Sequence, residues 1–443
     1  MSGNFDFMKN ILPSAYDNWV ESEKLAHIDY KKAAQAMRNA MEVVATQYIS
    51  KNKLTDKFMK EVKSDYHDLK KVELKYKLDF LEKNGLINDP GLASKYILHN
   101  GRKRDDFFDF SRDVGNNSSH PGEIVTYSEL CTCLTGWHKV LREMYKPKNA
   151  GAFKEGKMPI GEYEIYHCEI PKDRDRSHCI LEYYAIKPGN IVDQYALIRE
   201  YDKKAVGATG KKFLKRNVDA IDIAKQEADT FTIGMPDVEE ITPYESNKTN
   251  SYLFAYIFRR KPQALEDVLK KGLTLPERLK LCRQIAECLL GLHQSSIPIY
   301  HRLLSYGSIY LCDYHDMKKG WIPYLTKFDF SKLELANDDM TIRDFADDAK
   351  DSMPSEMSKY IHPQWSSGNW EAVDEYALSI LCVDILNGGI VKSLDEQKDA
   401  MEDMEDEGVS GELINCLKAM RSDERPGLEY VLEFLNEEEK KWS

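Results

Sequence analysis

The sequence predicts a multidomain protein in which an all-α helical bundle is followed by an α+β domain with two lobes. Residues 1–150 show helical periodicity without strand-like alternation, strand-like runs begin at Tyr163, and helical periodicity returns from Leu275. A length of 443 residues favours two or three domains. Hydrophobic residues make up 42% of the chain, which supplies at least one sizeable core and excludes a largely disordered protein.

The net charge of −12 is unevenly distributed along the chain. Residues 1–150 carry a net charge of +3, and the remainder carries −15. An acidic region repels a phosphate backbone, whereas a near-neutral one can contact it. We therefore place the domain boundary near residue 150, with the bundle at 1–147 and the second domain at 148–443. Its two lobes are expected at about 152–260 and 261–443.

Composition and cysteine spacing favour a cytoplasmic protein without a metal site. No run approaches the ~18 apolar residues of a membrane span, and the N-terminus MSGNFDFMKN lacks the pattern of a secretory signal. The nine cysteines are scattered without a CxxC pair, and Cys131 and Cys133 are too close for typical zinc spacing. We expect reduced thiols and no membrane association.

Three segments of the first 150 residues place apolar side chains at helical spacing. They are Tyr30–Ser50, Lys53–Asn84 and Thr126–Tyr145. Glycine and proline residues lie in the gaps between them. The pattern predicts a bundle of long helices.

A short polar element, RDVGNNSSH from Arg112 to His120, lies between the second and third of these segments. Together with AMRNAMEVVATQYI at Ala36–Ile49, it resembles the HEPN superfamily over roughly residues 15–147. Many HEPN proteins are metal-independent endoribonucleases that act as dimers. The resemblance therefore implies a catalytic pair of Arg112 and His120, with Asn116 as an auxiliary polar group.

These residue types suit RNA cleavage without a metal. Histidine titrates near neutral pH and can move the proton of a 2′-hydroxyl, and arginine supplies a fixed cation for the charge of the transition state. Seven residues separate Arg112 from His120, more than in most ribonuclease members. The alternative is structural: Arg112 forms an ion pair at a helix end and His120 begins a turn before Pro121.

The second domain begins with strand-like runs and ends with helices. The expected strands are Tyr163–Ile170, Cys179–Ile186, Gln194–Tyr201 and Ser251–Phe258, with a short helix at Lys225–Phe231. From Leu275 onward, apolar residues recur at helical spacing. A sheet-rich lobe thus precedes a helix-rich lobe.

Five segments of this domain, in order, resemble the protein kinase fold. YHRLLSYGSIYL (Tyr300–Leu311) resembles the catalytic loop, and LTKFDFSK (Leu325–Lys332) resembles the magnesium-binding loop. The end of the activation segment, a buried helix and the closing helix are matched by HPQW (His362–Trp365), DEYALSILCVDILNGG (Asp374–Gly389) and CLKAMRSDERPGLEYVLEFL (Cys416–Leu435). The resemblance spans nearly 300 residues.

The catalytic-loop match keeps His301 and Arg302 but lacks the groups that transfer phosphate. Phosphoryl transfer needs a carboxylate to accept the hydroxyl proton, magnesium ligands and a phosphate cradle. Leu303 stands at the position of the proton-accepting Asp and Ser308 at that of a magnesium-binding Asn. Lys327 stands where the other magnesium ligand is expected.

The remaining kinase positions are also altered. Arg199 replaces the lysine of the third strand, and Glu227 is the expected ion-pair partner from the following helix. A register shift of two would offer Asp329 as a metal ligand. The phosphate-covering turn, Pro171–Arg176, contains no glycine. The resemblance therefore implies a pseudokinase, and we expect no cofactor, neither ATP nor magnesium.

Three functions are compatible with this organisation. In the first, a dimeric HEPN-like endoribonuclease is controlled by a pseudokinase sensor or scaffold, an arrangement that suits phage defence or a toxin–antitoxin system. In the second, the helical domain dimerises without catalysis and the acidic pseudokinase binds a protein partner. In the third, the chain is a divergent kinase or nucleotidyl-transferase. RNA is the expected partner of the N-terminal domain in the first.

Overall fold

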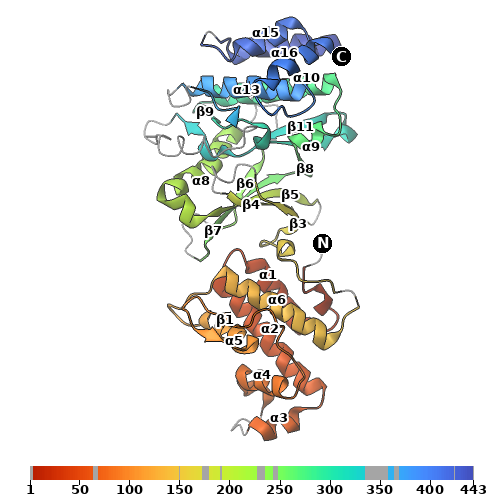
Figure 1. Cartoon of the computed structure of the whole chain (residues 1–443), viewed down its shortest axis with the longest axis vertical. Helices are drawn as coiled ribbons and strands as arrows, with labels where there is room; N and C mark the ends of the chain where they lie inside the picture. Colours follow the sequence, from red (N-terminus) through yellow and green to blue (C-terminus); the bar gives the residue numbers. More distant parts are fainter. Residues whose placement is uncertain are drawn as a thin grey trace. The chain divides into compact units, whose positions relative to one another are not determined.

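A computed structural model describes the chain except for residues 1–2, 63–67, 149, 172–178, 190–191, 227–234, 243–247, 335–357, 364–368, 424 and 443. The chain forms two compact units. The first comprises Met1–Cys168, Tyr184–Val192 and Ile241–Tyr252, and the second comprises Glu169–Tyr183, Asp193–Glu240 and Leu253–Ser443. The first is mainly helical and the second combines sheet and helix, so the protein is multidomain and α+β (Figure 1).

The first unit is built around one central helix. This helix, α2 (Tyr30–Lys51), contacts the other helices of the bundle. They are α1 (Pro13–Leu25), α3 (Thr55–Val62), α4 (Leu74–Lys83), α5 (Phe107–Asn117) and α6 (Tyr127–Tyr145). A short hairpin of β1 (Tyr96–Ile97) and β2 (Lys103–Arg104) precedes α5.

Side-chain caps and one close helix contact explain where these helices form. Asp29 caps α2 by accepting a hydrogen bond from the Lys32 amide. Thr126 and Glu129 form a reciprocal capping box at the start of α6. Gly136 of α6 lies directly against the ring of Phe107 on α5, where a Cβ atom would clash. The missing side chain lets the two helices approach closely.

A five-stranded sheet has the order β3-β4-β5-β7-β6. Its strands are β3 (Glu164–Glu169), β4 (Cys179–Lys187), β5 (Gln194–Asp202), β6 (Asp237–Glu240) and β7 (Ser251–Phe258). Strands β6 and β7 pair antiparallel. Helix α8 (Lys203–Gln226) follows β5 and contacts β5 and β6. Nearly every residue of β7 is buried, because the strand lies inside the sheet.

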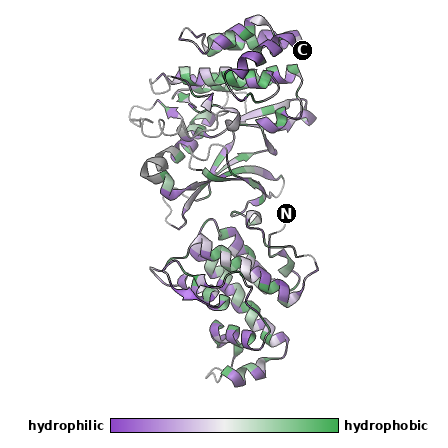
Figure 2. Ribbon diagram, viewed as in Figure 1, coloured by the Kyte–Doolittle hydropathy of each residue, from purple (hydrophilic) through white to green (hydrophobic). Residues whose placement is uncertain are grey.

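The remainder of the second unit contains small sheets and a stack of helices. Strands β8 (Pro262–Ala264) and β11 (Gly320–Leu325) flank β10 (Ile309–Tyr314), and β9 (Ile299–Tyr300) pairs with β12 (Lys332–Leu333). The helices are α9 (Leu265–Leu269), α10 (Leu275–His293), α13 (Trp370–Leu386), α14 (Glu396–Asp406), α15 (Gly411–Ala419) and α16 (Leu428–Trp442). Helix α13 is buried at every position from Ala372 to Leu386, in keeping with its apolar colouring in Figure 2.

Most of the predicted elements are confirmed. Helices α2 and α6 match the predicted Tyr30–Ser50 and Thr126–Tyr145, and β7 matches Ser251–Phe258. The other predicted strands correspond to β3, β4 and β5 within two residues at each end. None of the described helices is both long and apolar enough to cross a membrane.

Two predictions of local structure are wrong. The segment Lys53–Asn84 contains two helices, α3 and α4, with the 3-10 turn η2 (Leu69–Lys71) between them. The hairpin β1–β2 adds strand structure to a region expected to be purely helical. Of the predicted short helix at Lys225–Phe231, only Lys225 and Gln226 lie within the described residues, where they end α8, a helix that begins at Lys203. Two glycines and many charges weaken the helical pattern of α8.

Candidate functional site

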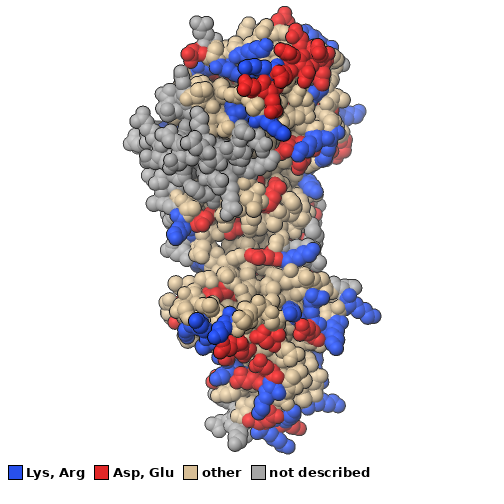
Figure 3. Space-filling view, in the orientation of Figure 1, with Lys and Arg blue, Asp and Glu red and all other residues tan. Residues whose placement is uncertain are grey.

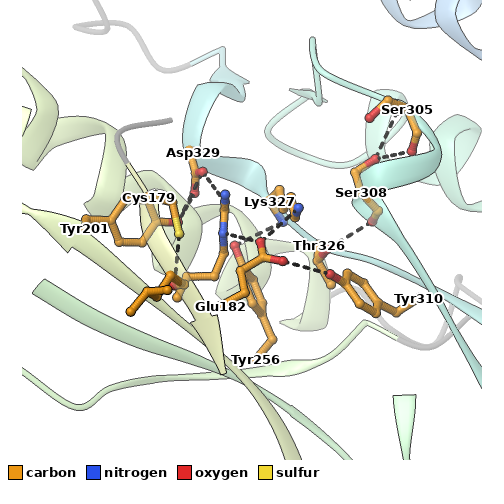
Figure 4. Close-up of polar contacts among 12 residues, drawn as sticks. Cys179, Glu182, Tyr201, Tyr256, Ser305, Ser308, Tyr310, Thr326, Lys327 and Asp329 are labelled. Carbon is orange, nitrogen blue, oxygen red and sulfur yellow. Dashed lines mark hydrogen bonds and ion pairs between the residues drawn. The ribbon is translucent and has the colours of Figure 1, made fainter. Parts of the chain in front are cut away.

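The positions that resemble a kinase active site converge on a buried arginine in the second unit. Arg199 lies on β5 and is fully buried. Its Nε atom lies 2.9 Å from Oε1 of Glu182 on β4, and its NH1 atom lies 2.7 Å from Oδ2 of Asp329. Figure 4 shows the polar contacts of Glu182, Lys327 and Asp329 in this region. Arg199 therefore has two buried carboxylates as partners.

Asp329 lies in the 3-10 turn η6 (Phe328–Phe330) and is 3% exposed. Besides the ion pair with Arg199, it accepts hydrogen bonds from the hydroxyl of Tyr201 and from the amide of Asn217 on α8. Burial raises the pKa of Tyr201 well above its usual value, so the hydroxyl stays protonated and donates. The carboxylate of Asp329 is thus bound by three neighbouring side chains.

Lys327 supplies a second cation to the same cluster. Its Nζ atom lies 3.0 Å from Oε1 of Glu182. Its backbone is left-handed, with φ of 65°, which is uncommon for a lysine. The amide of Lys327 donates to the hydroxyl of Tyr256, which itself donates to Asn217 at 2.6 Å. Hydrogen bonds from β7 and α8 therefore support this strained position.

Tyr310 completes the cluster from β10. Its hydroxyl donates to Oε2 of Glu182 at 3.4 Å, and both residues are buried. Glu182 thereby interacts with Arg199 and Lys327 through one oxygen and with Tyr310 through the other. We call Glu182, Arg199, Lys327 and Asp329 the ionic cluster. Its two cations and two carboxylates compensate each other.

The segment that resembles the catalytic loop is held by backbone contacts. The amides of His301 and Arg302 donate to the two carboxylate oxygens of Asp374 on α13, at 2.7 and 2.6 Å. The Nε2 atom of His301 contacts the carbonyl of Thr326 at 2.9 Å, and burial lowers the pKa of this imidazole. The backbone of Arg302 is in the left-handed region, with φ of 62°, and its guanidinium lies over the ring of Trp370.

Leu303 and Ser308 offer no group for phosphoryl transfer. Leu303 carries an apolar side chain where a proton acceptor would be needed. The hydroxyl of Ser308 donates to the carbonyl of Ser305 at 2.8 Å and accepts from its amide at 3.1 Å. It thereby closes the 3-10 turn η4 (Tyr306–Ser308). Glu227 and most of the Pro171–Arg176 turn lie outside the described residues.

The residues of the ionic cluster do not fit a nucleotide with magnesium. Lys327 places an ammonium where a metal ligand is required, and Asp329 is enclosed by Arg199, Tyr201 and Asn217. Over the part of the chain that the structure describes, no group of three or more His, Cys, Asp or Glu side chains is arranged to hold a metal ion.

The Arg112–His120 element lies at the end of α5 in the first unit. Arg112 and Asn116 lie four residues apart on one face of this helix. Arg112 forms an ion pair with Asp109 at 2.6 Å and lies 3.9 Å from Asp113. Asn116 accepts a hydrogen bond from Nε of Arg38 on α2 at 3.1 Å. Both side chains are therefore held by neighbours in the bundle.

His120 follows α5 and is exposed. Its carbonyl accepts a hydrogen bond from Lys31 at 3.3 Å, while its imidazole has no hydrogen bond or ion pair among the described residues. The structure thus places Arg112 and Asn116 on one helical face and His120 beyond the helix end. Gly115 permits this packing, since a Cβ atom there would lie 3.0 Å from Cβ of Arg38.

Several residues of both regions were not singled out from the sequence. In the second unit these are Glu182, Asn217, Tyr256 and Tyr310, which lie on four different elements. In the first unit they are Lys31, Gln35 and Arg38, which recur at helical spacing on α2. Arg38 lies within the segment that resembles HEPN proteins. The helical spacing of Lys31, Gln35 and Arg38 is the signal that could have identified these three residues.

Two comparisons with known proteins gave no match. No family model matches the sequence, and no curated protein matches it. The geometry of the two regions is therefore the basis for assigning a function.

Proposed function

We propose that the second unit is a pseudokinase, a protein-kinase-like unit that binds partners without transferring phosphate. The ionic cluster carries this proposal, because a buried, compensated network occupies the positions where metal and phosphate contacts would be needed. The anchoring of His301 and Arg302 to Asp374 on α13 supports the kinase-like fold. The ion pair of Arg425 with Glu375, at 2.5 Å, supports it as well.

We propose further that the first unit is a HEPN-like endoribonuclease that the pseudokinase controls, with RNA as substrate. The exposed imidazole of His120 supports this role, since a general base must reach the 2′-hydroxyl of a bound strand. Arg112 would stabilise the charge of the transition state and Asn116 would contact the substrate as a polar group. Both are expected to exchange their present partners, Asp109 and Arg38, for RNA.

The deciding experiment is RNA cleavage in the presence of EDTA. We expect discrete fragments from the wild-type chain and from His315→Ala, which removes another half-exposed histidine in the second unit. His120→Ala should lose about 100-fold or more in rate, as expected for a general base. Equal cleavage by His120→Ala and the wild type would assign the activity elsewhere.

A second candidate is a non-catalytic adaptor. The observation that favours it is that Arg112 and Asn116 already have protein partners, as structural residues would. In this case the expected partner is a basic protein, because acidic side chains gather over the C-terminal helices (Figure 3). Absence of cleavage by every variant, together with intact self-association, would support the adaptor.

A further inference from the structure

Helix α2 contacts two separate segments of the first unit through its first three turns. At its start, Asp29 forms an ion pair with Lys248 at 3.3 Å, and the hydroxyl of Tyr30 accepts a hydrogen bond from the amide of Asn250 at 3.2 Å. Lys248 and Asn250 belong to the segment that leads into β7, and Ile241–Tyr252 is part of the first unit. The start of α2 is therefore tied to this segment.

The next turns of α2 hold the candidate ribonuclease segment. Lys31 donates to the carbonyl of His120, and Arg38 donates to Asn116. Gln35, which lies between them, accepts hydrogen bonds from the hydroxyls of Ser118 at 3.1 Å and Ser119 at 2.6 Å. These three residues of α2 lie on one face of the helix, because they are spaced by four and three positions. They fix the segment that carries His120.

We propose that α2 regulates the candidate ribonuclease site by coupling residues 248–250 to residues 116–120. The inference rests on the proposed ribonuclease function, because it names the regulation of that site. A helix rises 1.5 Å per residue, so Tyr30 and Arg38 are about 12 Å apart along a stiff element. Gly115 packs tightly on the side chain of Arg38, so a displacement of α2 is transmitted to α5 at this contact.

The proposal identifies Lys31, Gln35 and Arg38 as positioning residues that act on His120 through its backbone neighbours. A shift at Tyr30 is transmitted through these residues to residues 116–120 and so changes how His120 is presented to RNA. Coupling of this kind is a free energy shared by the two segments, and it must act with equal strength in both directions.

The test is hydrogen–deuterium exchange on the full-length chain. Tyr30→Phe removes only the hydroxyl that accepts from Asn250, and Lys248→Ala removes an exposed partner of Asp29. We expect Tyr30→Phe to speed exchange at residues 116–120 by about fivefold, the equivalent of one lost hydrogen bond, and Lys248→Ala, which removes an exposed pair, to speed it by less. Lys24→Ala, which removes an exposed ion pair with Glu162, is the matched control and should leave those rates unchanged.

Reciprocity provides the second arm of the test. Asn116→Ala should also speed exchange at residues 248–252, because the coupling acts in both directions. Unchanged exchange at 116–120 in both Tyr30→Phe and Lys248→Ala would overturn the coupling, as would an effect in one direction only. The readout needs no RNA, so loss of the proposed ribonuclease function would leave this result interpretable, and failure of the coupling would leave the cleavage assay intact.

Discussion

The ionic cluster of the second unit and the Arg112–His120 element of the first differ in how far their charged groups are exposed to solvent. Arg199 is fully buried and pairs with two buried carboxylates. Arg112, by contrast, is 15% exposed and pairs with Asp109, which is 40% exposed, and His120 is open to solvent. The buried charged groups of the second unit have fixed partners within the fold. The more exposed groups of the first unit can exchange their partners for a ligand.

This difference shows why motif residues have to be judged by their partners. A buried charge contributes to stability only while its partner is present, because desolvation makes an unpaired charge costly. An exposed pair contributes little to stability and is readily replaced by a ligand. The same residue types therefore stabilise the fold in the second unit, whereas in the first unit we propose that they bind a ligand.

The largest expected effect is the loss of Arg199. Arg199→Met leaves Glu182 and Asp329 buried with Lys327 as the remaining cation, so we expect the second unit to lose about 3–5 kcal/mol of unfolding free energy. Urea unfolding followed by exchange of the β5 amides measures this loss. The matched control is Arg260→Met, which removes an exposed pair with Asp316 and should change stability little. Equal losses for the two variants would remove the distinction between buried and exposed pairs.

A buried carboxylate of the first unit sharpens the comparison. Glu23 is fully buried, accepts hydrogen bonds from Asn4, and has no ion pair within the described residues. Burial raises its pKa from 4.5 to about 7. A raised pKa favours the protonated form in the folded state, so this stabilisation is present below pH 4.5 and lost as the pH rises through 7.

The melting temperature of the first unit should therefore fall between pH 5 and pH 8, by several degrees, and Glu23→Gln should reduce that fall. Glu82, whose pKa is also raised to about 7 by burial, contributes to the same fall, whereas His138, whose pKa burial lowers from 6.5 to about 4, opposes it below pH 6.5. A wild-type protein and a Glu23→Gln variant with parallel pH profiles would contradict this assignment. Thermal scans across the pH range, followed by near-ultraviolet circular dichroism, provide the measurement.

A smaller effect is expected where α2 and α5 touch. Gly115→Ala inserts a methyl group 3.0 Å from Cβ of Arg38, and such overpacking costs about 1–3 kcal/mol. Gly151→Ala adds the same methyl group where nothing lies within 4 Å, and it should be nearly neutral. Urea unfolding of the two variants measures the difference. Equal stability of Gly115→Ala and Gly151→Ala would show that the contact between Gly115 and Arg38 can accommodate a methyl group.

The smallest expected effect is that of nucleotide on the second unit. A ligand that binds the folded state raises the melting temperature by mass action. Because the ionic cluster occupies the candidate site, ATP with magnesium should leave the melting temperature unchanged and no phosphate should be transferred. A clear rise in melting temperature with ATP would show that the ionic cluster can exchange its partners for a ligand. The cluster would then no longer differ in this respect from the Arg112–His120 element.

Periodicity and spacing predicted much of the fold, but not the pairing of side chains. The apolar stripe of α2 and the continuous apolar and aromatic run of β7 were sufficient to place those elements. Helix α8 was mostly missed, since glycines and charges obscure its stripe. Arg199 and Asp329 were both identified as altered kinase positions, yet their contact joins residues 130 positions apart and depends on the tertiary fold.

The candidate site of the first unit was predicted only in part. Arg112, Asn116 and His120 were identified from the motif, whereas the hydrogen bonds of Arg38, Gln35 and Lys31 to this segment were not. Helical spacing placed those three residues on one face of α2. Which helix that face meets depends on helix packing, which local sequence does not specify.

The contact between Gly115 and Arg38 has an evolutionary consequence. A side chain larger than glycine at position 115 displaces the stem of Arg38, and loss of Arg38 leaves Asn116 without its hydrogen-bond partner. Substitutions at these three positions are therefore expected to occur together across diverging descendants of this chain, whether or not RNA is cleaved. The Gly-Asn pair of the motif would persist through packing alone, and His120 would be free to vary wherever catalysis has been lost.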